Sequence, residues 1–270
     1  MLRDITLGQY YPADSVIHRL DPRVKLFGTI IYIISLFSMR GIVALGVATL
    51  FLFVVIKVSK VPFKFMVKGL KAIMILLLIT AVFNLFLTPG ETLVSFWKFR
   101  ITEEGVANAV MIAIRLTFLI LGTSIMTLTT TPNQLTDGME KSMMPLSKIG
   151  VPVHAIAMMM SIALRFIPIL IEETDKIMKA QMARGADFES GNLLKRVKNM
   201  IPLLVPLFIS AFRRADDLAM AMEARCYHGG EGRTKMKPLH YAKRDYLTYL
   251  ILLAYLAVVI ACRAFLPWPQ

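Results

Sequence analysis

Long runs of apolar residues are the feature that most restricts how this chain can fold. A helix needs about 20 such residues to cross the hydrocarbon core of a bilayer. Stretches that approach this length are Leu26–Met39, Ile42–Ile56, Ala72–Leu87, Gly105–Thr130 and Tyr246–Phe265. With 56% hydrophobic residues and a mean hydropathy of +0.62, the chain is too apolar for an ordinary soluble domain. The sequence therefore predicts an all-α integral membrane protein with about five transmembrane helices.

The charge pattern predicts which loops lie in the cytoplasm. The chain has 31 basic and 18 acidic residues, and excess positive charge marks cytoplasmic loops. A group of lysines with no acidic residue among them follows the second apolar run: Lys57, Lys60, Lys64, Lys68 and Lys71. The loop that ends at Glu104 has mixed charge and suits the outside. We therefore expect a cytoplasmic N-terminus and an external C-terminus. No nucleic-acid-binding motif accompanies the basic residues.

The region from residue 131 to residue 244 is rich in charge and contains two further apolar runs, Val151–Ile171 and Ile201–Ala211. A histidine, an arginine and a proline interrupt the first run, at positions 154, 165 and 168. The second run is too short to span a bilayer and contains two prolines. If the first run crossed the membrane, the positive-inside pattern of the following loop would break. We therefore expect two long helices at the membrane interface, with apolar sides toward lipid or a membrane partner.

These patterns predict three regions. Residues 1–130 form an N-terminal membrane region with four transmembrane helices, and residues 131–244 form a cytoplasmic or interfacial coupling-helix region. Residues 245–270 form the last transmembrane helix and an external tail. Within the coupling-helix region, Asp187–Asn192 is the expected hinge between the two helices, and Gly229–Gly232 ends the second helix.

A short motif occurs at the end of both predicted coupling helices, as Ala183-Arg184-Gly185 and Ala224-Arg225-Cys226. The arginines lie 41 residues apart, and each follows an aspartate, Asp175 or Asp216, at the same distance. An arginine near a helix C-terminus suits the helix dipole, and glycine commonly ends helices, so either motif alone fits an ordinary helix end. The repetition favours a binding role. Small neighbours leave the guanidinium as the main bulk of a narrow tip, which can bond partner carboxylates or carbonyls.

The N-terminal stretch carries a second motif, Gly8-Gln9-Tyr10 followed by Ser15-x-x-His18-Arg19-Leu20-Asp21-Pro22-Arg23-x-Lys25. Asp21 and Pro22 predict a helix start, because aspartate caps helices and proline is favoured at their first position. We expect the residues before Asp21 to form a cytoplasmic collar that packs on the rest of the chain. His18 fits a hydrogen-bonded structural residue better than a ligand.

This N-terminal string, the apolar spans and the two Ala-Arg motifs occur in an order that resembles the transmembrane T component of energy-coupling factor transporters, over nearly the whole chain. The resemblance implies a non-catalytic subunit of an ABC-type importer in the bacterial cell membrane. It also implies two cytoplasmic ATPases as partners, together with a membrane-embedded substrate-binding S component. The implied ATPase contacts are Ala183, Arg184, Gly185, Ala224, Arg225 and Cys226, with Cys226 standing where a glycine or another small residue is more usual.

The resemblance leaves the substrate open between vitamins and transition-metal ions, because recognition belongs to the S component. The N-terminal signature and the absence of metal-ligand clusters favour a vitamin-type module shared by several S components. A T component dedicated to cobalt or nickel is an alternative. Neither catalytic residues, nor metal ligands, nor a cofactor are expected, and Gly229–Thr234 lacks the lysine and spacing of a phosphate-binding loop. No disulfide is expected between Cys226 and Cys262.

A stand-alone secondary transporter is an alternative from another class. Such a protein has charged or broken helices near the membrane midplane in both halves, whereas here Arg115 is nearly alone inside an apolar run. Arg115 itself has two interpretations: a functional intramembrane charge, or an arginine that bonds the carbonyls of a neighbouring helix. Methionines at 143–144 and 158–160 suggest an adaptable docking surface for unlike S components, because methionine repacks easily.

Overall fold

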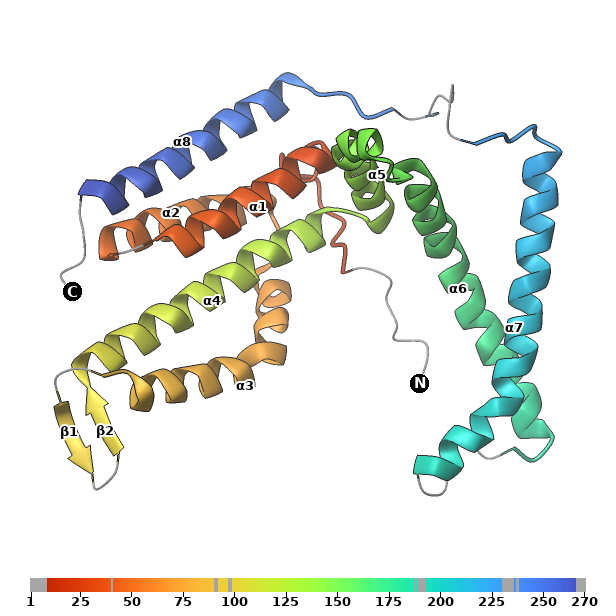
Figure 1. Cartoon of the computed structure of the whole chain (residues 1–270), viewed down its shortest axis with the longest axis horizontal. Helices are drawn as coiled ribbons and strands as arrows, with labels where there is room; N and C mark the ends of the chain where they lie inside the picture. Colours follow the sequence, from red (N-terminus) through yellow and green to blue (C-terminus); the bar gives the residue numbers. More distant parts are fainter. Residues whose placement is uncertain are drawn as a thin grey trace. The chain divides into compact units, whose positions relative to one another are not determined.

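The structure is a computed structural model that describes residues 9–39, 41–89, 92–96, 99–186, 188, 193–229, 236 and 238–265. Its elements are α1 (Pro22–Ser38), α2 (Ile42–Ser59), α3 (Phe63–Leu87), β1 (Thr92–Phe96), β2 (Phe99–Thr102), α4 (Glu103–Thr129), α5 (Pro132–Met143), η2 (Met144–Ile149), α6 (Val153–Ala183), α7 (Leu193–Glu223) and α8 (Lys243–Phe265) (Figure 1). The predicted all-α membrane fold is confirmed, with one short β-hairpin added to it.

The chain divides into two compact units. We call residues 8–138 and 239–270 the bundle unit, and residues 139–238 the crossed-helix unit. The bundle unit contains α1 to α4 and α8, while the crossed-helix unit contains α6 and α7. Helix α8, late in the chain, therefore lies in the same unit as α1.

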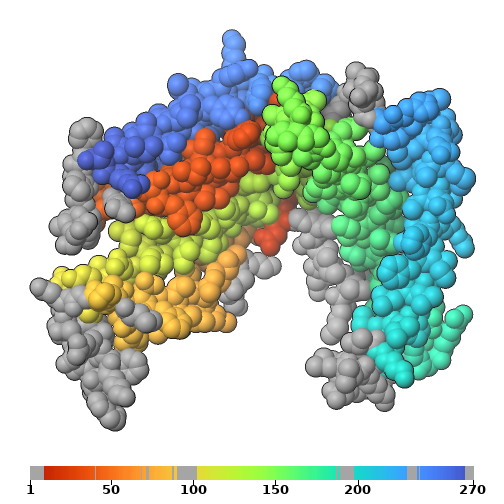
Figure 2. Space-filling view, in the orientation of Figure 1, coloured from red at the N-terminus to blue at the C-terminus, as the bar shows by residue number. Residues whose placement is uncertain are grey.

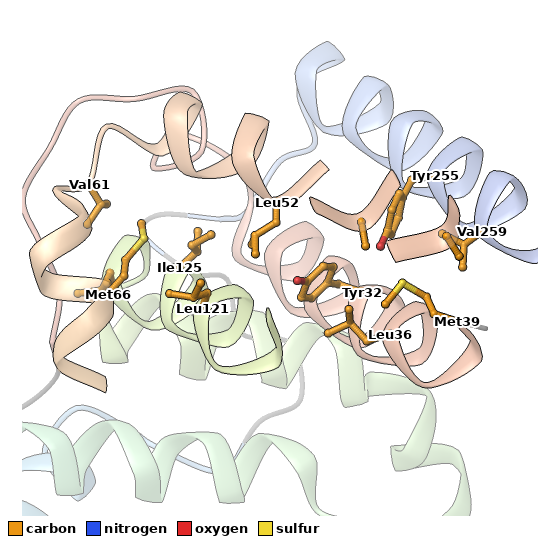
Figure 3. Packing of buried hydrophobic residues seen from close by; sticks show 13 residues of the cluster. Tyr32, Leu36, Met39, Leu52, Val61, Met66, Leu121, Ile125, Tyr255 and Val259 are labelled. Carbon is orange, nitrogen blue, oxygen red and sulfur yellow. The ribbon is translucent and has the colours of Figure 1, made fainter. Parts of the chain in front are cut away.

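The bundle unit is held together by a continuous apolar core between its helices. In it, α4 packs on α1, α2 and α3, and α8 packs on α1 and α2. Figure 3 shows side chains from all five helices meeting in this core. Its buried members are Tyr32, Leu36, Met39, Ala44, Ala48, Leu52, Val61, Met66, Leu121, Ile125, Leu128, Tyr255 and Val259.

Three aromatic rings, from three helices, stack inside this core. The centroids of Tyr32 of α1, Phe51 of α2 and Tyr255 of α8 form a triangle, with Phe51 at 6.1 Å from Tyr32 and 4.1 Å from Tyr255, and 6.5 Å between the tyrosines. The Tyr32 hydroxyl donates to the Phe118 carbonyl of α4 at 3.1 Å, so this buried polar group is satisfied. Gly122 lies against the same ring: a Cβ at that position would stand 2.1 Å from a Tyr32 ring carbon. Only glycine leaves the space that the tyrosine fills.

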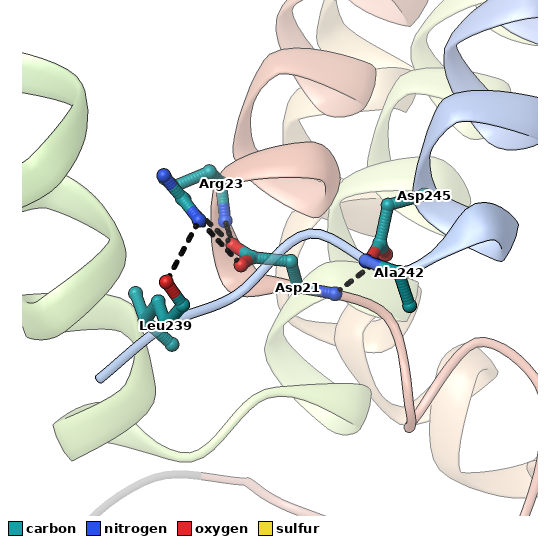
Figure 4. A network of polar contacts seen from close by, with 5 residues as sticks. All are labelled: Asp21, Arg23, Leu239, Ala242 and Asp245. Carbon is teal, nitrogen blue, oxygen red and sulfur yellow. Dashed lines mark hydrogen bonds and ion pairs between the residues drawn. The ribbon is translucent and has the colours of Figure 1, made fainter. Parts of the chain in front are cut away.

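A polar cluster joins the starts of α1 and α8 (Figure 4). Asp21 caps α1, since its carboxylate accepts from the Arg23 backbone N–H at 2.9 Å, and Pro22 occupies the first helical position. Both predictions for these residues are confirmed. Asp245, which is 1% exposed, accepts from the Asp21 N–H at 3.0 Å and from the Ala242 N–H at 2.7 Å. One buried carboxylate therefore satisfies a backbone donor at the start of each helix.

The helices cover the apolar runs that the sequence predicts to span the membrane. Among the residues that the structure describes, four helices are long and apolar enough to cross a bilayer: α2, α4, α6 and Lys243–Ala264 of α8. The predicted first span forms α1, whose 17 residues rise about 26 Å, somewhat less than the hydrocarbon core. The sequence placed the apolar part of α6 along the interface, although its length and composition also suit a span. The five-span topology stays a prediction.

Two elements were not predicted from the sequence. The loop predicted to be external contains the antiparallel hairpin of β1 and β2, in which Thr92 pairs with Thr102. Pro132, shortly after the end of α4, is the first residue of α5. The Thr131 hydroxyl accepts from the Gln134 N–H at 3.3 Å, and the Gln134 side chain accepts from the Thr131 N–H at 3.2 Å. This reciprocal capping box starts α5.

Candidate functional site

The two Ala-Arg motifs end α6 and α7 with the same backbone geometry. At the end of α6, the N–H groups of Arg184 and Gly185 donate to carbonyls three residues back, and that of Ala186 donates to the Gln181 carbonyl, five residues back. At the end of α7, Arg225, Cys226 and Tyr227 repeat this pattern, with the last bond made to the Met222 carbonyl. These bonds form the same Schellman-type helix end twice, 41 residues apart.

The third motif residue takes the left-handed backbone conformation at both ends. Gly185 has φ of 89° and Cys226 has φ of 54°. The conformation costs glycine nothing, whereas for a residue with a Cβ it costs roughly 1–2 kcal/mol. This geometry explains why glycine suits the position and why Cys226 is a departure. The bond pattern is the same at both helix ends, so Cys226 keeps the shape of the end despite that cost.

Both motif arginines are exposed and free to bind a partner. Arg184 and Arg225 are classed as exposed, together with the alanine before each. Within the described part of the chain, neither guanidinium has a hydrogen-bond or ion-pair partner. Neither side chain is therefore used to cap the carbonyls of its own helix. Each arginine offers a planar set of donors at a narrow, exposed helix end.

The helices α6 and α7 cross and are joined by polar contacts in the crossed-helix unit (Figures 1 and 2). Glu173 of α6 accepts from the Arg214 guanidinium at 2.6 Å and 3.1 Å, and from the Ser210 hydroxyl at 2.5 Å. Farther along, the Gln181 side chain donates to the Pro202 carbonyl at 3.3 Å. That carbonyl has no helical partner, because Pro206, four residues on, lacks an N–H. Sequence reasoning did not identify these contacts.

One side of α7 presents a stripe of exposed apolar residues. The stripe follows helical spacing, and its members are Met200, Ile201, Leu204, Val205, Phe208, Ile209 and Phe212. Monomeric soluble proteins rarely expose so long an apolar row, which marks contact with lipid or another protein. Among the predicted docking methionines, Met144, Met159 and Met160 are also exposed. Apolar surface is therefore available on both α6 and α7.

The N-terminal motif forms a packed collar on the bundle unit. The His18 Nε2–H donates to the Tyr11 carbonyl at 3.0 Å, while its Nδ1 accepts from the Ser15 hydroxyl at 2.7 Å. A carbonyl can only accept, so Nε2 carries a proton. With Nδ1 accepting from the serine hydroxyl, the pairing fits a neutral imidazole. Burial lowers the pKa of His18 below its ordinary value, and the nearby Lys25 ammonium acts in the same direction. His18 is a hydrogen-bonded structural residue, as the sequence predicted.

Other collar residues fasten this segment to the bundle helices. The Tyr11 N–H donates to the Leu128 carbonyl at 2.9 Å. The buried Lys25 ammonium donates to the Thr129 carbonyl at 2.7 Å and to the His18 carbonyl at 3.1 Å, so it ties the collar to the end of α4. Arg19 forms an exposed ion pair with Asp14. The predicted packing of the collar is confirmed for the described residues, which exclude Gly8.

Arg115 has the structural role that the sequence left open. Its Nη2 donates to the Met39 carbonyl at 3.0 Å, and Met39 is the C-cap of α1. A cation there also suits the negative end of the α1 dipole. Arg115 therefore joins α4 to the end of α1.

The remaining site predictions are partly outside the described residues. In the part that the structure describes, no group of three or more His, Cys, Asp or Glu residues is placed to hold a metal ion. The predicted hinge Asp187–Asn192 is described only at Phe188, and the predicted stop Gly229–Gly232 only at Gly229. Both cysteines are free.

Comparison with known proteins adds an independent finding. The family model described as cobalt transport protein, CbiQ, matches residues 13–236. The chain is 58% identical over 268 residues to the energy-coupling factor transporter transmembrane protein EcfT of Clostridium kluyveri, covering 97% of this chain and 98% of that relative. Proteins of the same name match from Acidaminococcus fermentans, at 52% identity with 99% and 98% coverage, and from Bacillus subtilis, at 46% with 98% and 100%.

Proposed function

Since the chain belongs to the cobalt transport protein family, among members named energy-coupling factor transporter transmembrane protein EcfT, we propose that it couples two cytoplasmic ATPases to a membrane-embedded substrate-binding S component. Family membership makes it a multi-pass cell-membrane protein and a non-catalytic transporter subunit. The proposal adds the partners, the residues that bind them and the direction in which force passes.

The observation that carries the proposal is the repetition of one helix end. Two ends with the same hydrogen-bond pattern each present one exposed arginine after an alanine, and neither arginine has a partner among the described residues. A pair of like ends fits a pair of like sockets, and a guanidinium makes bidentate bonds to carboxylates. The ATPase contacts are accordingly Ala183, Arg184, Gly185, Ala224, Arg225 and Cys226.

The apolar side of the coupling helices supports a role in holding the S component. The exposed stripe on α7 and the exposed methionines of α6 are suited to a membrane protein surface, because methionine adapts to different partners. The helices would act as levers: their ends follow the ATPases while their apolar sides carry the S component. In this arrangement the N-terminus is cytoplasmic and the C-terminus external.

The substrate proposed is a vitamin or another micronutrient, bound by the S component. The name of the matching family model favours a second candidate, a T component dedicated to cobalt. Both candidates use the same coupling residues, since neither assigns substrate recognition to this chain. They differ in the S component with which the chain assembles.

Reconstitution in proteoliposomes tests the proposed function against a stand-alone transporter. The chain alone should take up no substrate, with or without an ion gradient. Adding both ATPases, an S component and ATP should start uptake. Gradient-driven uptake by the chain alone would contradict the proposal and favour a secondary transporter.

A further inference from the structure

The ion pair between α6 and α7 lies at equivalent positions of the two helices. Arg184 follows Glu173 by eleven residues, and Arg225 follows Arg214 by eleven residues. Glu173 and Arg214 are therefore related by the same 41-residue offset that relates the two helix ends. The Arg214 Nη2 and Nε both donate to Oε2 of Glu173, at 2.6 Å and 3.1 Å. The point where the helices are joined is thus equally far from both ends along the chain.

The two ends lie on opposite sides of this contact. Contacts run antiparallel: Glu173 meets residues 210 and 214, while Gln181, later in α6, meets residue 202, earlier in α7. Figure 1 shows the two helices running in opposite directions through the crossing. At 1.5 Å per residue, each arm of eleven residues measures about 16 Å. The arrangement is a two-armed lever with equal arms.

Charge at the crossing is complementary rather than repeated. Under the 41-residue offset, Glu172-Glu173 of α6 corresponds to Arg213-Arg214 of α7. Like charges at these positions would repel where an antiparallel pair brings equivalent residues together. Opposite charges let the equivalent positions bond where the helices cross. The Ser210 hydroxyl holds the other oxygen of Glu173 at 2.5 Å, which fixes the orientation of the carboxylate.

We propose that Glu173 and Arg214, with Ser210, are the pivot of the two coupling helices. They are positioning residues: the contact fixes the point at which α6 and α7 cross, so a displacement of one helix end is passed to the other over an equal arm. Two like ATPases would then act on the levers symmetrically. The inference rests on the proposed function, which gives the two ends their partners.

Distance measurements on the full chain test the pivot without any partner. Spin labels are placed on Cys substitutions of Lys179 and Met220, exposed positions related by the same offset, with Cys226 and Cys262 changed to Ser. In lipid nanodiscs the parent should give one narrow distance distribution. Glu173→Gln and Arg214→Gln should each broaden the distance distribution, because each removes one charge of the pair. In Glu173→Gln the neutral amide also keeps the size of the side chain.

Neighbouring residues supply matched controls. Glu172→Gln and Arg213→Gln remove the same charges from exposed positions beside the pair, and should leave the distribution narrow. Reversing the pair in one protein, with Glu173→Arg and Arg214→Glu, should restore it. An unchanged distribution in both single pivot variants overturns the proposal. Equal broadening in the controls, or no recovery in the reversed pair, overturns it as well.

Measurements on the assembled transporter separate the pivot from the proposed function. Pivot variants should still co-purify with both ATPases but should take up less substrate per ATP hydrolysed. Normal uptake per ATP in both pivot variants would overturn the pivot. If the helix ends are not the ATPase contacts, substitutions of Arg184 and Arg225 will leave ATPase capture by the chain unchanged. The proposed function then fails, while the spin-label result still stands.

Discussion

Cys226 is a residue with a measurable conformational cost. It holds φ of 54° in the position that Gly185 holds at the other helix end. We predict that Cys226→Gly stabilises the end of α7 by about 1 kcal/mol, and that Gly185→Ala destabilises the end of α6 by about the same amount. Hydrogen exchange at the Tyr227 and Ala186 amides should report these changes, at about fivefold each. Equal exchange in parent and variants would show that the backbone conformation carries no such cost.

His18 gives the collar a predictable dependence on pH. Burial lowers its folded-state pKa below the ordinary 6.5, so the unfolded chain takes up a proton that the folded chain resists. The free energy of unfolding should therefore fall as pH is lowered through 6.5 toward the folded pKa, and its His18 contribution should be constant above that range.

Thermal unfolding in detergent between about pH 7.5 and about pH 5.5 measures this effect. The His18→Gln variant is the control, because it cannot titrate in that range, and its midpoint should vary less with pH. An identical slope for both proteins would contradict the assignment of the neutral, buried imidazole.

At the scale of elements, close approach between helices depends on a few small residues. Gly122 of α4 faces the Tyr32 ring, and an added Cβ would overlap it at 2.1 Å. We predict that Gly122→Ala displaces Tyr32 from the aromatic stack and destabilises the bundle by about 1–3 kcal/mol. This loss should exceed the gain in helix propensity of about 1 kcal/mol.

Gly46 of α2 provides the matched control, because nothing lies within 4 Å of its added Cβ. Gly46→Ala should leave the thermal midpoint unchanged or raise it slightly. If both variants unfold at the same temperature, the ring contact is not the limiting one in this core.

The sequence predicted most helices because their apolar runs and caps are local signals. Asp21 and Pro22 mark the start of α1, and the Ala-Arg motifs mark the ends of α6 and α7. The start of α5 also has a local signal, the Thr131-x-x-Gln134 capping box, but no helix was predicted from it. In the hairpin, only β2 alternates apolar and polar residues, and its four residues, Phe99–Thr102, are too few to be a strong signal.

Contacts between distant residues were beyond sequence reasoning. Glu173 and Arg214 each fit a solvated helix face when considered singly, and only the antiparallel crossing brings them together. Asp245 similarly meets Asp21 because α8 packs in the same unit as α1. The two interpretations of Arg115 could not be separated for the same reason. Its partner, the Met39 carbonyl, lies 76 residues away in the sequence.

At the level of the whole chain, the proposed function assigns α6 and α7 the role of levers. Family membership establishes a transporter subunit with several apolar helices. The positive-inside pattern predicts that the coupling helices face the cytoplasm, where ATP is available to the proposed partners. We therefore propose that Arg184 and Arg225 join this chain to two ATPases.

Co-purification with the two ATPases tests that claim most directly. Arg184→Glu and Arg225→Glu are compared singly and together, with Arg213→Glu as an exposed control on α7. Each single change should weaken capture, because a guanidinium that bonds a partner carboxylate is replaced by a repelling charge. The double variant should capture neither ATPase while remaining folded in the membrane, and the control should capture both. Normal capture of both ATPases by the double variant would mean that the two Ala-Arg motifs are ordinary helix ends.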